Sequence, residues 1–336
     1  MHEALYYEPQ GQAVMCRLCP KGCTIAEGRT GFCRARTNTG GKLYSLNYAQ
    51  TTAQALDPIE KKPLYHFYPG STILSLGTWG CNFACKFCQN WHIAQEQPQT
   101  GSLEPQEAAN LATQLTGRGN IGIAYTYSEP SVWYEYILDT ARLVQAAGLK
   151  NVLVSNGFIN EQPLAELLPF IDAMNIDIKA YSDNFYQKVC AGQLEQVKRT
   201  VEQAAKHCHV EITTLVVPGL NDSERELLAL AEWLANINAD IPLHFSRYFP
   251  NYKMDEPPTP VSTLTMAYNT ARKYLHYVYI GNIGGEFNNT YCPECGYKVI
   301  DRLNGYSYLA EDAENGSGKN CPQCGRSIYI IGKVNF

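Results

Sequence analysis

The sequence lacks any apolar run of the ~18 residues that a membrane-spanning helix needs. Its start also lacks the basic and long apolar segments of a secretory signal, because Glu3 and Glu8 interrupt it. Basic residues are not in excess, since 27 Lys and Arg stand against 32 Asp and Glu, for a formal net charge of −5. A whole-chain basic surface for nucleic acid or anionic membrane is therefore excluded. We expect a cytoplasmic protein that binds no membrane.

Charge of either sign is sparse, at 18% of residues, while 45% of residues are hydrophobic. That balance excludes a chain that is disordered throughout. With 336 residues, the chain is long enough for one large domain with appendages, or for two domains.

Cysteine, by contrast, is abundant: 13 residues are present, and eleven of them form three clusters. The clusters are Cys16, Cys19, Cys23 and Cys33; Cys81, Cys85 and Cys88; and Cys292, Cys295, Cys321 and Cys324. Proteins with this many disulfides are usually short and secreted, whereas this chain is long and has no signal. Spacings of two or three residues instead predict metal ligands in a reducing compartment.

The cysteine clusters divide the chain into three regions. We expect a four-cysteine metal-binding segment at 1–70, with loops and short strands, because Gly and Pro punctuate it. We expect a core domain at 71–285, and paired cysteine knuckles in a separate region at 286–336. Residues 311–319 have the composition of a solvated loop.

The core region alternates between strand and helix patterns. We expect strands at 72–76, 121–125, 151–154, 174–178, 210–217, 242–245 and 277–280. We expect helices at 105–115, 132–147, 163–170, 194–207, 222–236 and 261–274. Such alternation predicts an α/β fold in which crossover helices join parallel strands. Six strands, or seven if the last one counts, predict a partial or complete β/α barrel, and a doubly wound open sheet is the alternative.

The motif Cys81-x3-Cys85-x2-Cys88 directly follows the first of these strands. Thiolates at this spacing bind an iron–sulfur cluster or zinc, and an ordinary site of either kind takes four protein ligands. The next cysteine is Cys190, and His92 is the nearest alternative ligand. The motif therefore predicts a site completed by His92, an open iron that binds a non-protein ligand, or buried structural cysteines.

Residues 81–88 (CNFACKFC) resemble the CxxxCxΦC signature of radical S-adenosylmethionine (SAM) enzymes, with Phe87 as the aromatic residue. The resemblance implies a [4Fe–4S] cluster held by Cys81, Cys85 and Cys88, whose fourth iron binds SAM. One electron from the cluster would cleave SAM to methionine and a 5′-deoxyadenosyl radical, which abstracts hydrogen from a substrate.

Later segments resemble the cofactor-binding segments of the same family, at the strand ends where β/α barrels carry function. Residues 127–130 (YSEP) resemble its GGEP motif with both glycines replaced, and 155–157 and 177–179 resemble segments of glycyl-radical-enzyme activating enzymes. The resemblance implies SAM contacts from Phe87, Tyr127, Ser128, Glu129, Ser155, Asn156, Asp177, Lys179 and His244. Simpler interpretations are a common turn for Asn156 and Gly157, a surface ion pair for Asp177 and Lys179, and a hydrogen-bonded core residue for His244. Val154 stands where those enzymes carry an acid.

Five long segments narrow the resemblance to one subgroup. They are residues 57–70, 85–91, 124–130, 214–222 and 244–250. They resemble the AmmeMemoRadiSam system radical SAM enzymes, relatives of pyruvate formate-lyase activating enzyme, nearly from end to end. The resemblance names no substrate.

The two outer cysteine clusters predict further metal sites. Cys292, Cys295, Cys321 and Cys324 form paired knuckles, each followed by a glycine, which predicts a zinc ribbon, with rubredoxin-like iron as the alternative. Cys16, Cys19, Cys23 and Cys33 would close either a tetrahedral zinc site or a second [4Fe–4S] cluster. The sequence leaves that choice open.

The isolated Cys190 is a core residue or, as a candidate catalytic residue, a hydrogen donor to a product radical. Cys208 is expected in the core. Tyr125, Tyr127, Tyr181 and Tyr248 lie near predicted strand ends and are candidates for lining a substrate pocket.

The leading hypothesis is a radical SAM enzyme that abstracts hydrogen from an unidentified substrate, with a protein among the candidates. It implies a [4Fe–4S] cluster, SAM, zinc and a one-electron reductant of the flavodoxin or ferredoxin type. A glycyl-radical-enzyme activase proper is one alternative. An iron–sulfur electron carrier or redox sensor with a zinc-ribbon docking module is another, and the acidic net charge disfavours an enzyme that modifies nucleic acid.

Overall fold

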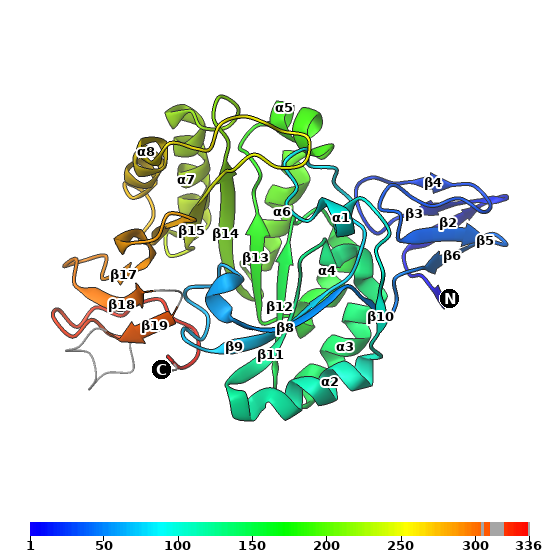
Figure 1. The fold of residues 1–336 in the computed structure, drawn as a ribbon, viewed down its shortest axis with the longest axis horizontal. Helices are drawn as coiled ribbons and strands as arrows, with labels where there is room; N and C mark the ends of the chain where they lie inside the picture. The colour runs from blue at the N-terminus through cyan, green and yellow to red at the C-terminus, as the bar shows by residue number, and fades with distance from the viewer. Residues whose placement is uncertain (304–305, 310–318, 335–336) are drawn as a thin grey trace.

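The computed structural model describes residues 1–303, 306–309 and 319–334, and its centre is an eight-stranded sheet (Figure 1). Seven strands are parallel, and β8 pairs antiparallel with β9 at one edge. In spatial order the strands are β16 (Val278–Gly281), β15 (Leu243–Arg247), β14 (His209–Val216), β13 (Ala173–Asp177), β12 (Lys150–Ser155), β11 (Asn120–Thr126), β9 (Thr72–Gly77) and β8 (Ala53–Pro58). All seven predicted strands are thereby confirmed.

The order of the parallel strands follows the order of the chain. A doubly wound sheet would reverse direction at a switch point, and this sheet does not, so that alternative is wrong. Among the described residues, β16 and β8 do not pair with each other, so the sheet stays open as a partial barrel. β8 is an addition to the prediction, because residues 53–58 fall in the region that the sequence assigns to the N-terminal segment.

Helices connect the parallel strands, as predicted. They are α2 (Pro105–Gln114), α3 (Tyr134–Ala146), α4 (Glu161–Leu167), α6 (Leu194–Ala204), α7 (Glu224–Asn238) and α8 (Val261–Ala271), with the short α1 (Trp91–Ala94) and α5 (Asp183–Phe185). The Ser223 side chain caps α7 by accepting a hydrogen bond from the Glu226 N–H. Gly148, with φ of +75°, follows the end of α3. No helix in the described part of the chain combines the length and apolar character needed to cross a bilayer.

The N-terminal segment folds into short strands, as its composition predicts. One sheet contains β1 (His2–Glu3), β6 (Lys42–Ser45) and β5 (Arg36–Thr39), and another contains β2 (Tyr7–Gln10), β3 (Ala13–Cys16) and β4 (Thr24–Ile25). β7 (Gln50–Thr51) pairs with β10 (Gly101–Ser102), which belongs to the core region. A buried ion pair between Arg36 and Glu135 of α3 ties this segment to the barrel. Removing either partner would leave an unpaired buried charge, so the loss of Arg36 or of Glu135 would destabilise this attachment.

The C-terminal region lies on the other side of the central sheet from the N-terminal strands (Figure 1). It contains β17 (Thr290–Tyr291), β18 (Lys298–Leu303) and β19 (Tyr306–Leu309). The buried Arg302 guanidinium donates a 2.7 Å hydrogen bond to the carbonyl of Tyr65, which precedes the barrel. The solvated loop predicted at 311–319 lies outside the described residues except for Lys319.

Candidate functional site

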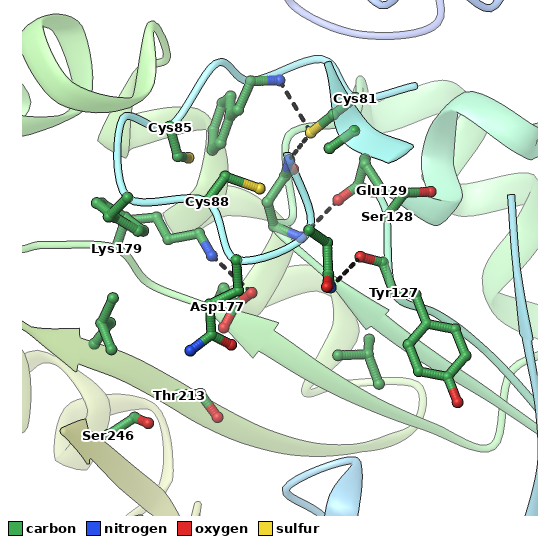
Figure 2. Close-up of a pocket in the computed structure, with 18 of the residues that line it drawn as sticks. Cys81, Cys85, Cys88, Tyr127, Ser128, Glu129, Asp177, Lys179, Thr213 and Ser246 are labelled. Atoms are coloured by element: carbon green, nitrogen blue, oxygen red, sulfur yellow. Dashed lines mark hydrogen bonds and ion pairs between the residues drawn. The ribbon is translucent and has the colours of Figure 1, made fainter. Parts of the chain in front are cut away.

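A cavity of about 260 Å³ opens where the parallel strands end (Figure 2). The carboxyl ends of parallel strands meet at one edge of a sheet, which brings residues far apart in sequence together. Cys81, Cys85 and Cys88 lie on one side of the cavity, and Asp177, Thr213 and Ser246 come from three neighbouring strands or strand ends. The predicted residues among its lining are Cys81, Cys85, Phe87, Cys88, Tyr127, Ser128, Glu129, Asn156, Asp177 and Lys179.

The three cysteines lie on the loop between β9 and α1. Cys81 Sγ accepts a hydrogen bond from the Phe83 N–H at 3.3 Å, and Asn156 Nδ2 lies 3.7 Å from the same sulfur. Burial raises the pKa of the Cys88 thiol to about 11. Such thiols stay protonated until a metal displaces the protons. His92 and further cysteines are absent from the described lining, so the set fits a cluster that leaves one iron open to another ligand.

Glu129 organises the wall of the cavity beside Cys81 (Figure 2). Its buried carboxylate accepts hydrogen bonds from Ser131 N at 2.9 Å, Ser155 Oγ at 2.8 Å and Asn156 N at 2.8 Å. Burial raises the pKa of Glu129, although these three donors oppose that shift. Ser155 therefore lies behind the cavity wall and orients Glu129, whereas Asn156 reaches the cavity itself.

Tyr127 adopts a left-handed backbone conformation, with φ of +69°, where the resembled motif has its first glycine. Its ring points away from the three cysteines (Figure 2), and its hydroxyl donates a 2.8 Å hydrogen bond to Asp57 Oδ2. Its carbonyl accepts a 2.7 Å bond from Asn90 Nδ2. A Cβ added at Gly77 would lie 2.8 Å from the Tyr127 ring, so that glycine makes room for the turn.

Asp177 and Lys179 form a 2.8 Å ion pair beside the cysteine loop. Their side chains are 31% and 16% exposed, so the pair is half-buried in the cavity, not on the outer surface. Burial lowers the pKa of Lys179, but the charge and hydrogen bond of Asp177 together with the neighbouring Cys85 and Cys190 outweigh burial, and the net shift is upward. Lys179 Nζ also lies 6.0 Å from the centroid of the Phe87 ring.

The structure does not bring His244 to the cavity. The sequence was right that His244 lies on the sixth parallel strand, but it is two residues before Ser246, one layer deeper in the barrel. Its Nε2 lies 2.7 Å from Glu211 Oε2, which also receives the backbone N–H of Tyr65 at 3.0 Å. His244 thus belongs to a buried network that fills the barrel beneath the cavity.

Cys190 also lies outside the cavity lining, and its side chain is completely buried. A hydrogen bond between the Cys190 and Cys85 thiols, together with burial, raises the pKa of Cys85. Cys190 therefore packs behind the cysteine loop, in agreement with the core interpretation. Of the four candidate pocket tyrosines, Tyr125 and Tyr248 are buried in the core, and only Tyr127 lines the described cavity.

Several cavity residues were not predicted as site residues. Thr213 and Ser246 lie on β14 and β15, each two residues after an inward-facing member of the buried network, and Asn282 follows β16. Side chains alternate across a strand, so residues that lie two positions apart share a face. Counting in twos from an inward-facing residue would have found Thr213 and Ser246.

The four C-terminal cysteines form a compact group. Their sulfur atoms all lie within 4.8 Å of one another, with 3.6 Å between Cys292 and Cys324 and 3.5 Å between Cys295 and Cys321. Gly296 and Gly325 have φ of +75° and +78°, the tight turns that the sequence predicts. Four thiols at this spacing fit a single metal ion held tetrahedrally.

The four N-terminal cysteines line one small cavity together with Arg36 and Asn82. Burial raises the pKa of Cys19 to about 12 and that of Cys33 to about 11. The four cysteines therefore meet in space around one hollow, as the sequence predicts.

Comparison with known proteins gives the class of the molecule. The model of the radical SAM superfamily matches residues 76–231, which contain the cysteine loop and the Glu129 wall. The chain belongs to the radical SAM superfamily.

Three similarities extend this assignment. An uncharacterised protein of Methanocaldococcus jannaschii, MJ0808, is 44% identical over 98% of this chain and 100% of its own length. A protein of the same organism, MJ1632, provisionally named a glycyl-radical enzyme activating enzyme, is 24% identical over 60% of this chain and 78% of its own. The structure of Streptococcus suis SuiB bound to S-adenosylmethionine covers 76% of this chain and 64% of its own, with a TM-score of 0.51 and 11% identity. That last likeness concerns the fold.

Proposed function

We propose that this protein is an enzyme that binds a [4Fe–4S] cluster through Cys81, Cys85 and Cys88 and cleaves SAM there. When bound, the cluster and SAM supply a 5′-deoxyadenosyl radical for hydrogen abstraction. The observation that carries the proposal is the set of three cysteines, without a fourth protein ligand in the described lining, at the edge of a polar cavity. An electron carrier would need no such open position.

The residues of the chain divide the work of holding SAM. Lys179 offers a positive charge, and Asp177 and Glu129 offer hydrogen-bond acceptors, at different points of the same cavity. Asn156 is oriented by Glu129 and reaches towards Cys81, so it links the SAM-binding wall to the cluster loop. Phe83, Phe87 and Leu215 supply the apolar surface that excludes water from a reactive radical.

For the substrate, we propose a protein. The similarity to a protein provisionally named an activating enzyme favours a protein substrate. The absence of an acid at Val154, which lines the cavity, argues against an activase proper. The proposal includes three further predictions. The protein belongs to the AmmeMemoRadiSam subgroup, it receives its electron from a flavodoxin or ferredoxin, and its C-terminal cysteines bind zinc.

The test is an anaerobic assay of the reconstituted, dithionite-reduced protein with SAM, followed by chromatography of 5′-deoxyadenosine. We expect product from the wild type and none from Cys85→Ala, because the cluster loses one of its three ligands. Cys208→Ala, which changes a cysteine outside the three clusters, is the matched control and keeps full activity. Product from Cys85→Ala would contradict the cluster assignment. A cluster EPR signal that SAM does not change would favour the electron carrier.

A further inference from the structure

The spacing of the sulfur atoms distinguishes the cysteine clusters from one another. Zinc bonds thiolates at ~2.3 Å, which places tetrahedral ligand sulfurs a little under 4 Å apart. The C-terminal cysteines meet that spacing, at 3.5 Å and 3.6 Å. In the described part of the chain they are the sole group with all ligand atoms within 4.8 Å, so Cys16, Cys19, Cys23 and Cys33 stand wider apart. The proposed cluster ligands Cys81, Cys85 and Cys88 do too.

A wider spacing around a shared hollow is the arrangement that an iron–sulfur cluster needs, because each thiolate binds a different iron. Leu18, Ile25 and Val132 line the N-terminal hollow together with the four cysteines. Arg36 Nη1 lies 4.0 Å from Cys16 Sγ, and the Phe32 N–H donates to Cys23 Sγ at 3.4 Å. Cations and N–H donors at the sulfurs stabilise an anionic cluster.

This hollow shares a wall with the cysteine loop of the candidate active site. Asn82, next to Cys81 in the chain, lines the hollow and accepts a 2.9 Å hydrogen bond from Asn156. The same Asn156 nitrogen lies 3.7 Å from Cys81 Sγ. Gly80, on the other side of Cys81, packs so closely on the Cys33 carbonyl that an added Cβ would lie 2.7 Å from it.

Lys21 makes a second connection between the two sites. Its ammonium group donates a hydrogen bond to the Ala191 carbonyl, in the turn directly after Cys190. Cys190 in turn contacts Cys85. Cys81 is therefore linked to the N-terminal hollow through Asn82 and Asn156, and Cys85 through Cys190 and Lys21.

We propose that Cys16, Cys19, Cys23 and Cys33 hold a second iron–sulfur cluster, which exchanges single electrons with the first across the Asn82 wall. An external one-electron donor is oxidised, the N-terminal cluster is reduced by one electron, and that electron passes to the cluster at Cys81. The identity of the N-terminal metal is independent of the proposed function, whereas the destination of the electron rests on it.

Metal content tests the first half of the proposal. Three proteins are reconstituted without oxygen: the wild type, Cys16→Ser/Cys19→Ser, and Cys81→Ala/Cys85→Ala/Cys88→Ala. We expect ~8 iron atoms per chain in the wild type and ~4 in each variant. The triple variant decides alone if the double variant does not fold. About 4 iron atoms in the wild type and none in the triple variant, with zinc in the N-terminal site, would overturn the proposal.

EPR spectroscopy of the fully reduced proteins tests the electron exchange. We expect broadened, faster-relaxing signals in the wild type, because two neighbouring paramagnetic clusters interact, and single-cluster signals in both variants. A wild-type spectrum equal to the sum of the two variants would overturn the coupling. SAM added to Cys16→Ser/Cys19→Ser should still shift the EPR signal of the cluster at Cys81. If only this shift is lost, the result contradicts the proposed function and not the second cluster.

Discussion

At the scale of single residues, the cavity depends on a backbone conformation that sequence patterns do not reveal. A side chain other than glycine in the left-handed region costs on the order of 1 kcal/mol, and Tyr127 accepts that cost at φ of +69°. The cost is offset by its hydrogen bond to Asp57, which is 70 positions away in the chain. The resemblance predicts Tyr127 as a cofactor contact, but its hydroxyl group serves to hold the turn.

The ionisation of Asp57 should make the stability of the fold depend on pH. Burial raises its pKa, but hydrogen bonds from Lys62 and Tyr127 outweigh burial and hold the pKa well below the ordinary 3.8. Asp57 therefore stabilises the fold above about pH 4, and this contribution is lost as the pH falls below that value.

We expect Asp57→Asn to lower the free energy of unfolding near neutral pH, and the gap to the wild type to shrink below pH 4. Urea titrations between pH 3 and pH 7 measure it, with the exposed Asp255→Asn as the control. A gap that stays constant over this range would contradict the assignment.

Cysteine spacing could be read directly from the sequence because ligands to one metal lie close together in the chain. The position of His244 could not. Periodicity shows that a strand residue faces inward, but the depth within the barrel depends on its partner Glu211, on another strand. A histidine beneath the cavity and one inside it have the same sequence pattern.

At the scale of secondary-structure elements, strand–helix alternation predicts the parallel sheet well, because each unit carries its own hydrophobic pattern. β8 escaped prediction because its sequence, Ala53–Pro58, has no β-branched or aromatic residue. Its partner β9 is what makes it a strand. Edge strands of this kind need tertiary information.

The connection between β9 and the cysteine loop should not tolerate a side chain at Gly80. Gly80 has φ of +92° and packs against the Cys33 carbonyl. Gly80→Ala should lower the free energy of unfolding by well over 1 kcal/mol, because it adds a backbone clash to the strain of a left-handed residue.

Gly148→Ala is the matched control for this change. Gly148 has φ of +75°, but an added Cβ there meets nothing within 4 Å. It should therefore show the conformational cost alone, about 1 kcal/mol. Urea unfolding of both variants measures the difference, and equal losses would show that the N-terminal segment does not press on the cysteine loop.

At the scale of the whole molecule, the C-terminal cysteines are joined to the base of the barrel. The His66 ring contacts the Tyr279 hydroxyl at 2.6 Å, and Tyr279 in turn contacts Thr290 of β17 at 2.9 Å. The sequence predicts the knuckles from their spacing, but it contains no signal for this attachment. The region around the knuckles is therefore part of the same structure as the barrel.

Removal of the C-terminal metal should lower the stability of the whole molecule. Cys292→Ser should lose about one metal ion per chain and lower the melting temperature by several degrees, because such a site contributes folding energy. Iron content and SAM cleavage of the folded fraction should remain, since the cavity is formed by other elements. Calorimetry and elemental analysis measure these effects, with the exposed Asp255→Asn as control, and a loss of iron would contradict the separation of the sites.

The bridge between residue 331 and the start of the barrel bears on when the molecule can finish folding. Ile331 N donates to the His66 carbonyl at 2.8 Å, and the Tyr68 N–H donates to the Ile331 carbonyl at 2.8 Å. A chain emerges from the ribosome with its N-terminus first, so domains generally begin to fold from that end. The His66 carbonyl and the Tyr68 N–H must wait for residue 331, more than 260 positions later in the chain, before they are paired. A nascent chain can therefore assemble its parallel strands in order of synthesis, but the floor of the barrel closes only after residue 331 has left the ribosome.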